Sequence, residues 1–227
     1  MSAPRLPSQT SNRSQTSNTS SAAAASVRPP LKIHSTAIVS ERAVLTGSHP
    51  ITIGERAVIH PFAHLRAEGG SVTIGEYCTI DETAVVGLPA GEGGEVVLEK
   101  GVAVHSGAVV LGSIIGEGSE IGVKARIGKG ATVGQYATVA AAETVEDGGK
   151  VGDFGVVFGG GRKRVDGLLE GSEELRELRL TSQRKMCKAL ESLVPDGGMK
   201  RRGPPLVQVQ LELAPHAHMN AIKGPTL

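Results

Sequence analysis

Small and aliphatic residues recur with a period of six from Ile33 onward. The first slot of each six-residue repeat holds an aliphatic side chain: Ile33, Val39, Ile53, Ile59, Ile74, Ile80, Ile115, Ile121, Ile127 and Val133. The fifth slot holds a small one: Ala37, Ala43, Ala57, Ala63, Cys78, Ala84, Ser119, Ala125, Ala131 and Ala137. Because the fifth slot lies two residues before the next first slot, both side chains point to one face of a short strand. We expect that face to form the core.

This period predicts a left-handed parallel β-helix of hexapeptide repeats, in which three repeats, about 18 residues, form one coil. The architecture is a known exception to the right-handed crossover rule. An ordinary β-sandwich would need turn signals about every 8 to 12 residues, which this period does not supply. The second slot is often glycine, as expected where the backbone turns between strands. The sequence therefore predicts an all-β, single-stranded left-handed β-helix over residues 31–165.

Three interruptions with Gly or Pro predict loops leaving the coil, at TGSHPIT, AEGGSVT and GLPAGEGGEVV. Residues 166–195 are predicted to be a linker and a C-terminal helix, with Ser172 or Ser182 as the N-cap. One helical face gathers five apolar side chains: Leu175, Leu178, Met186, Leu190 and Leu193. We expect this helix to cover the flank of the β-helix or to cap its open end.

Both ends of the chain differ in composition from the repeats. Residues 1–30 are rich in Ser, Thr, Gln, Asn and Pro, and have too few apolar side chains to offset the entropy of ordering, so a disordered tail is predicted. Residues 196–227 form a second tail. Within it, residues 206–213 alternate apolar and polar side chains, which predicts one half-buried strand.

Charge and cysteine content limit which binding partners and which cellular compartment are expected. There are 24 Lys and Arg against 23 Asp and Glu, so no net field would attract nucleic acid. Cys78 and Cys187 match neither a disulfide framework nor a zinc spacing, which is typical of a reducing compartment, and we expect a cytoplasmic protein. No stretch approaches about 18 continuous apolar residues, so neither membrane insertion nor secretion is expected.

A zinc enzyme is one alternative for this fold. The chain is somewhat similar to the γ-class carbonic anhydrases, whose zinc is held by three histidines from neighbouring coils. Laid on this sequence, the three ligand positions are Gly87, Ser106 and Leu111, and none of these can donate an imidazole. Zinc catalysis needs three protein ligands and an open fourth position. No metal site is therefore expected.

The histidines offer a second alternative. His34, His60 and His105 occupy second slots, and His64 an outward sixth slot. Such corner imidazoles are usually hydrogen-bonded turn residues, but His105 could serve as the catalytic base of a hexapeptide acyltransferase.

Two further motifs are weaker. His216 and His218 form an HxH pair without further ligands, and FGGGRKR lacks the spacing of a phosphate-binding loop. We expect no catalytic, cofactor-binding or metal-binding residues.

The chain resembles the dynactin subunit 6 family over about Leu31 to Pro195. The resemblance rests on PLKIHSTAIVSERAVLTG, ITIGERAVIHPFAHLRAEGGSVTIGEYCTIDETAVV, IIGEGSEIGVKARIG, VFGGGRKRV and ALESLVP, and on the missing zinc ligands. It does not extend to the polar N-terminus or to the tail after Asp196.

The resemblance implies a non-catalytic structural subunit of the dynactin pointed-end complex, without a cofactor, that supports dynein-driven microtubule transport and cargo attachment. Its implied partners are dynactin subunit 5, another β-helix, together with the pointed-end actin-related protein and other dynactin subunits. The implied location is cytoplasmic and cytoskeleton-associated. The alternative is a γ-carbonic-anhydrase-like or acyltransferase hexapeptide enzyme.

Overall fold

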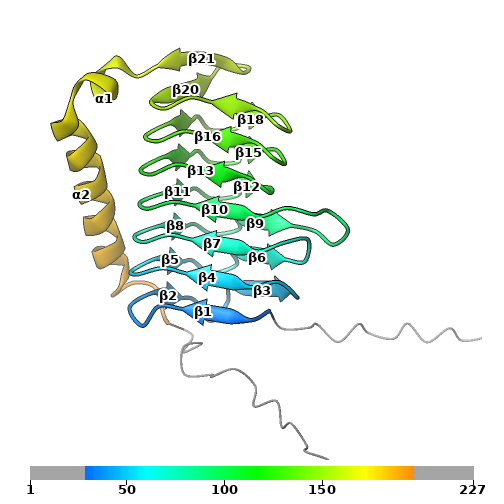
Figure 1. The fold of residues 1–227 in the computed structure, drawn as a ribbon. Helices are drawn as coiled ribbons and strands as arrows, with labels where there is room; N and C mark the ends of the chain where they lie inside the picture. Colours follow the sequence, from blue (N-terminus) through cyan, green and yellow to red (C-terminus); the bar gives the residue numbers. More distant parts are fainter. Residues whose placement is uncertain (1–28, 197–227) are drawn as a thin grey trace, which may run out of the picture.

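The computed structural model describes residues 29–196, which form a stack of β-coils with one long helix along its side (Figure 1). The rest of both tails, residues 1–28 and 197–227, lies outside the described residues, and so does the strand predicted at 206–213. None of the helices in the described part is long and apolar enough to cross a membrane.

Three sheets run the length of the stack, and each coil contributes one strand to each sheet in turn. Sheet 1 contains β1 (Leu31–Ile33), β4 (Ile51–Ile53), β7 (Val72–Ile74), β10 (Val96–Leu98), β13 (Ile114–Ile115), β16 (Thr132–Val133) and β19 (Lys150–Val151). Sheet 2 contains β2 (Ile38–Val39), β5 (Val58–Ile59), β8 (Thr79–Ile80), β11 (Ala103–Val104), β14 (Glu120–Ile121), β17 (Thr138–Val139), β20 (Gly155–Phe158) and β21 (Arg162–Val165). Sheet 3 contains β3 (Val44–Gly47), β6 (His64–Ala67), β9 (Val85–Leu88), β12 (Val109–Val110), β15 (Arg126–Ile127) and β18 (Thr144–Val145).

The strand register confirms the predicted left-handed parallel β-helix. Ile115 pairs with Val133 and Val133 with Val151, so each of these coils takes 18 residues. The earlier coils are longer, because the expected Gly- and Pro-containing loops leave the stack after β3, β6 and β9. Among the strands of residues 29–196, every pairing between successive coils is parallel, and the one antiparallel strand pair is β20 with β21.

First- and fifth-slot side chains form a single continuous core, as the repeat predicts. Ser119 is the polar exception in a fifth slot, and it is fully paired: its hydroxyl donates to the Gly134 carbonyl at 2.6 Å and accepts from the Ala137 N–H at 3.0 Å. Ile33 is only partly buried, because it belongs to the first coil. The core therefore depends on each coil covering the one before it.

The small fifth slot sets a limit on side-chain volume. We expect Ala125→Leu to destabilise the protein by about 1 to 3 kcal/mol, because Ala125 is fully buried between neighbouring coils and extra methylenes would overpack the interior. Thermal unfolding monitored by circular dichroism measures the effect. Val123→Leu is the matched control, since Val123 lies two residues away but is 43% exposed. Equal melting temperatures for both variants would contradict the inward assignment of Ala125.

Corner geometry differs from the expectation for the second slot. The left-handed backbone conformation falls on the fourth slot, for example at Arg56 with φ +50° and Tyr77 with φ +54°. The second-slot glycines answer a different need, the close approach of stacked coils. A Cβ on Gly54 would lie 2.7 Å from the carbonyl carbon of Gly75 in the next coil. Glycine is favoured there by sterics between coils and not by the turn itself.

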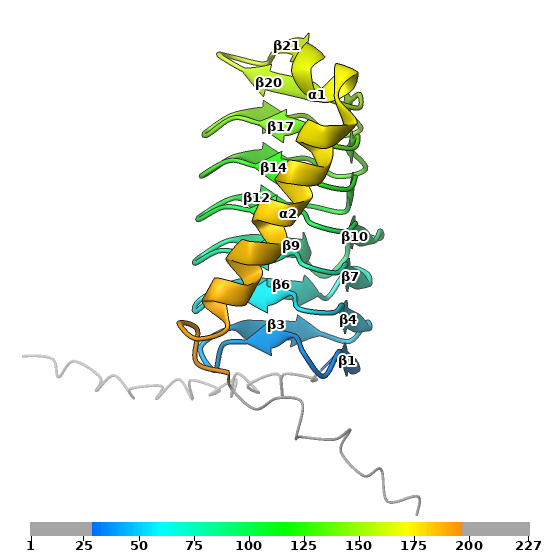
Figure 2. The ribbon, with the colours of Figure 1, turned by 90° about the vertical axis from the view of Figure 1, so that its left-hand side faces the viewer.

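After the last strand the chain reverses and returns along the outside of sheet 2. A short helix, α1 (Gly167–Gly171), leads into α2 (Glu173–Leu190), which runs down the flank of the stack toward the first coil (Figures 1 and 2). Ser172 is the N-cap, and its hydroxyl accepts a hydrogen bond from the Leu175 N–H at 3.3 Å. The helix was expected either on the flank of the β-helix or at its open end, and it lies on the flank.

The helix face that contacts the β-helix is not the predicted one. Four members of the expected apolar face, Leu175, Leu178, Met186 and Leu193, are exposed, and only Leu190 packs partly against the stack. Leu180 and Cys187 are buried instead. Leu180 lies against Gly101 and Gly118, where a Cβ on Gly101 would come within 2.9 Å of the Leu180 side chain. The space left by the absent side chains of these glycines decides which leucine faces inward. Helical periodicity cannot reveal that space.

The outer surface of sheet 2 matches the helix along its length. Near the first coils, Cys187 packs with Ile38, Val58 and Val194 in a small apolar cluster. In the middle, the Gln183 amide donates to the Thr79 hydroxyl at 3.1 Å.

Farther up the stack, the contacts become charged. The Arg179 guanidinium donates to Glu120 at 3.4 Å and to Thr138 at 3.2 Å. The change from apolar to charged contacts along sheet 2 favours a single position of the helix on the sheet.

Two leucines of α2 separate the effect of packing from that of helix propensity. We expect Leu180→Ala to lower the free energy of unfolding by about 2 kcal/mol or more, because the truncation empties a buried contact. Leu178→Ala, the control with the same chemical change, is 59% exposed and should stay within about 0.5 kcal/mol of wild type. Denaturant titration compares the two. A larger loss in Leu178→Ala would place the predicted apolar face inward after all.

Candidate functional site

Polar side chains line one corner of the stack, directly after the strands of sheet 2. Ser40 follows β2, His60 follows β5, Asp81 follows β8 and His105 follows β11. Their backbone groups stack in register: the His60 N–H donates to the Ile80 carbonyl, and the Asp81 N–H donates to the Val104 carbonyl, each at 2.9 Å. The β-helix therefore places residues that are about 20 positions apart in the sequence side by side in one column.

His105 is held between two carboxylates. Its Nδ1 lies 2.9 Å from an Asp81 oxygen, and its Nε2 lies 2.9 Å from a Glu120 oxygen. Glu120 lies on β14, on the outer side of sheet 2, where its second oxygen contacts Arg179 of α2 at 3.4 Å. Asp81, His105, Glu120 and Arg179 thus form a chain of contacts between the corner and the helix, here called the His105 cluster. It spans three coils and the helix.

Both carboxylates stabilise the charged imidazole. The hydrogen bonds with Asp81, and then with Glu120, raise the pKa of His105 to about 10. The same contact with His105 lowers the pKa of Glu120. At neutral pH the imidazole is therefore protonated and donates from both nitrogens.

These shifts link the cluster to stability. Because the folded-state pKa of His105 lies above the ordinary value of 6.5, its contribution is complete below about pH 6.5 and is lost as the pH rises through about 10.

His60 extends the column without joining the cluster closely. Its Nε2 lies 3.8 Å from the second oxygen of Asp81, too far for a hydrogen bond, and is buried without a hydrogen-bond partner in the structure. A buried polar atom of this kind is uncommon and marks a polar, poorly satisfied spot beside Asp81. The other histidines named by the sequence lie elsewhere: His34 contacts Thr36, and His64 is exposed on β6.

The sequence singled out His105 but missed the other three members of the His105 cluster. Asp81 was detectable, because it occupies the same second slot of the repeat as His60 and His105. Glu120 and Arg179 carried no comparable signal. One is an outward residue of a strand and the other belongs to a helix whose placement depends on tertiary contacts.

The positions that hold zinc ligands in the carbonic anhydrases cannot do so in this chain. Gly87 lies in β9 with φ +120°, and a Cβ there would come within 2.0 Å of the Arg66 carbonyl oxygen. An imidazole at this position would require the neighbouring coil to move. Within residues 29–196, no group of three or more His, Cys, Asp or Glu side chains is arranged to hold a metal ion.

Neither cysteine is a nucleophile at neutral pH. Burial raises the pKa of Cys78 to about 12 and that of Cys187 to about 11. Both side chains therefore remain thiols, whereas nucleophilic attack requires the thiolate. The Cys78 sulfur donates to the Glu99 carbonyl at 2.9 Å, and the Cys187 sulfur donates to the Tyr77 carbonyl at 3.3 Å.

The backbone N–H groups of the Gly-rich run at the end of the stack, residues 159–161, already bind a carboxylate of this chain. The backbone N–H groups of Gly160 and Gly161 each donate to the Glu143 carboxylate at 2.9 Å, which lowers its pKa. This contact attaches the turn between β20 and β21 to the coil that contains Glu143. An internal carboxylate takes the place that a phosphate would need.

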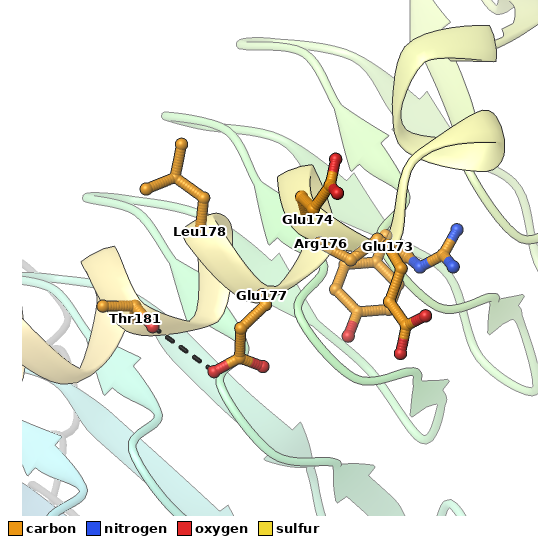
Figure 3. Close-up of a pocket in the computed structure, with 7 residues that line it drawn as sticks. Glu173, Glu174, Arg176, Glu177, Leu178 and Thr181 are labelled. Carbon is orange, nitrogen blue, oxygen red and sulfur yellow. Dashed lines mark hydrogen bonds between the residues drawn. The ribbon is translucent and has the colours of Figure 1, made fainter.

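An open groove of about 710 Å³ lies at the start of α2 (Figure 3). It is lined by Tyr136, Glu173, Glu174, Arg176, Glu177, Leu178 and Thr181. Its only cationic side chain, Arg176, donates to the carbonyls of Leu169 and Glu170 at 2.8 and 2.9 Å. The groove is therefore acidic and unsuited to a phosphate-bearing ligand.

No family model and no curated protein matches the chain. Among solved structures, it is similar to a hexapeptide transferase family protein from Anaplasma phagocytophilum, with 19% identity, a TM-score of 0.57, and coverage of 74% of this chain and 98% of the other. It is equally similar to a "putative acetyltransferase" of Bacillus cereus, with 19% identity, a TM-score of 0.57, and coverage of 71% and 96%. At these identities the likeness establishes the fold.

These comparisons correct the expected function. The chain was expected to be a non-catalytic structural subunit of dynactin and not an enzyme. Both expectations are wrong, because the similar solved structures are described as transferases. Most of the motifs that carried the resemblance consist of hexapeptide repeats, and such repeats report coil geometry more than activity. Kinship with the dynactin subunit 6 family, the expected partners and the cytoplasmic, cytoskeleton-associated location stay predictions.

Proposed function

We propose that this chain is an acyltransferase of the hexapeptide class, with His105 as the general base and Asp81 as its positioning residue. The observation that carries the proposal is the contact between Asp81 and His105 Nδ1 at 2.9 Å, on a surface-accessible corner of a hexapeptide β-helix. The transferase descriptions of the two similar structures support the same class.

The chemistry needs one proton acceptor near the attacking atom. An amine or hydroxyl acceptor attacks the carbonyl carbon of an acyl thioester, and the base removes the proton of the attacking group as the new bond forms. The carbon–sulfur bond then breaks, the acyl group remains on the acceptor, and the thiolate leaves and takes up the proton from the imidazolium. Asp81 orients the ring through Nδ1, so that Nε2 is the nitrogen that exchanges the proton.

Glu120 controls when Nε2 can accept a proton. At neutral pH Nε2 donates to Glu120, because the raised pKa of His105 keeps the imidazole protonated. The Glu120 side chain is 46% exposed and already touches Arg179 with its other oxygen. Turning fully toward Arg179 would free Nε2 and lower the pKa of His105, because one of the two stabilising contacts is lost.

The direct test is an acyl-transfer assay with the purified full chain. Acetyl-CoA is mixed with a panel of amine and hydroxyl acceptors between pH 7 and 10.5, and the released thiol is measured with a chromogenic reagent. We expect acceptor-dependent release that increases with pH toward about 10, as His105 loses its proton. Release no faster than without protein, for every acceptor and at every pH, would overturn the proposal.

A further inference from the structure

The two ends of the β-helix are finished differently. At the C-terminal end, β21 pairs with β20 and covers the last strand of sheet 2. At the N-terminal end, β1, β2 and β3 are the outermost strands of the three sheets. Within residues 29–196, no strand pairs with the outer edge of β1. An open edge of this kind presents backbone N–H and C=O groups for pairing with another strand.

The open end is apolar on its inner side. Leu31 and Ile33 of β1 pair in register with Ile51 and Ile53, which are buried in the core. Leu31 is nevertheless 42% exposed, and Ile33 is only partly buried, because the first coil has no coil beyond it in the described structure. A strand laid along β1 with apolar side chains facing inward would continue the core by one layer.

The chain itself returns to this end. Helix α2 runs down the flank to the first coil (Figure 2), and Asp196 forms an antiparallel bridge with Ser40, next to β2. Residues 197–206 then separate Asp196 from Val207. Ten residues can span up to about 33 Å, whereas a three-residue strand such as β1 is about 10 Å long. The free edge of β1 is therefore within reach.

The sequence beyond this tether has a matching pattern. Apolar side chains at Val207, Val209, Leu211 and Leu213 alternate with Gln208, Gln210 and Glu212. We propose that Val207–Leu213 pairs with the free edge of β1 and caps the β-helix. Its apolar side chains cover Leu31 and Ile33, and its polar side chains face water.

Covalent attachment favours this occupant over a second molecule. A short tether gives a segment an effective concentration in the millimolar range at its own binding site. The same segment of another copy would compete only at a comparable protein concentration. The cap is therefore expected to form within one chain.

Hydrogen–deuterium exchange on the full chain tests the cap. In the wild-type protein we expect the amides of residues 31–33 and 207–213 to be protected, at a level independent of protein concentration. The double variant Val209→Asp/Leu211→Asp should exchange at least tenfold faster in both segments, because it places charge against the core. Gln208→Asp/Gln210→Asp is the matched control, with the same added charge on the outer face, and should keep the protection.

Three results would overturn the cap. Amides 207–213 of the wild type could exchange at the rate of an unprotected peptide. Protection could increase with concentration together with a dimer mass in light scattering, which would assign the strand to a second copy. The inner-face and outer-face variants could also have equal effects, which would exclude a one-sided strand. The first two measurements use only the wild-type protein.

Discussion

Replacing His105 with alanine is expected to lower kcat/KM for acyl transfer by about 10²- to 10⁴-fold, the usual contribution of a positioned general base. The loss follows from geometry: His105 is the imidazole of the corner that Asp81 orients at 2.9 Å. The measurement is steady-state thiol release with acetyl-CoA at a pH near 10, where the wild-type base is half deprotonated.

Two companion variants separate catalysis from folding. His105→Gln retains a hydrogen-bonding side chain but cannot take up a proton, so its kcat/KM should drop as far as that of His105→Ala while its melting temperature stays closer to wild type. His64→Ala removes an exposed imidazole of β6 and should leave the rate unchanged. Wild-type rates in both His105 variants would remove His105 from the reaction.

Replacing Glu120 with glutamine is expected to lower the pKa of His105 from about 10 toward its ordinary value of 6.5. Glutamine has nearly the same shape as glutamate but carries no charge, so the imidazolium loses one of the two carboxylates that stabilise it. Each unit by which the pKa decreases increases the unprotonated fraction at pH 7 about tenfold. The acyl-transfer rate at pH 7 should therefore increase by at least tenfold, although a carboxylate has been removed from the site.

Titration of the His105 ring nitrogens by NMR measures this pKa without reference to activity. Glu82→Gln is the matched control, since it removes an equal charge from an exposed residue next to Asp81 and should leave the His105 titration close to wild type. An unchanged His105 pKa in Glu120→Gln would show that Glu120 does not stabilise the imidazolium. A lowered His105 pKa without a faster rate at pH 7 would confirm that Glu120 stabilises the imidazolium. It would also contradict the role of His105 as the base in acyl transfer.

The His105 cluster also joins the site to the helix. Arg179 contacts both Glu120 and Thr138. The carboxylate that binds the His105 imidazole therefore also takes part in the contact between α2 and sheet 2. As the pH rises through about 10, His105 in the folded protein loses its charge and its attraction to Glu120 weakens. We therefore expect the proposed activity and the attachment of the helix to depend on the same titration.

The repeating part of the fold was decided by the sequence alone. Ile53, Ile74 and the other first-slot residues fall in columns, one on each sheet, and a period of six predicts short strands whose aliphatic side chains fill a narrow interior. Local periodicity was sufficient because each coil contacts chiefly the coil before and the coil after it. The same reasoning located the loops, the helix that follows the coils, and Ser172 as one of two candidate caps.

The helix face and the site were decided only by tertiary structure. Leu175 and Leu178 satisfy the helical period as well as Leu180 does, but only Leu180 fits against the glycines of the corner, whose positions depend on the register of different coils. His105 was visible as a residue, whereas its protonation depends on Glu120, 15 positions away, and on Asp81, 24 positions away. A hexapeptide pattern records which side chains face the core. Charge and reactivity reside on the outer surface, where stacking and helix docking bring distant residues together.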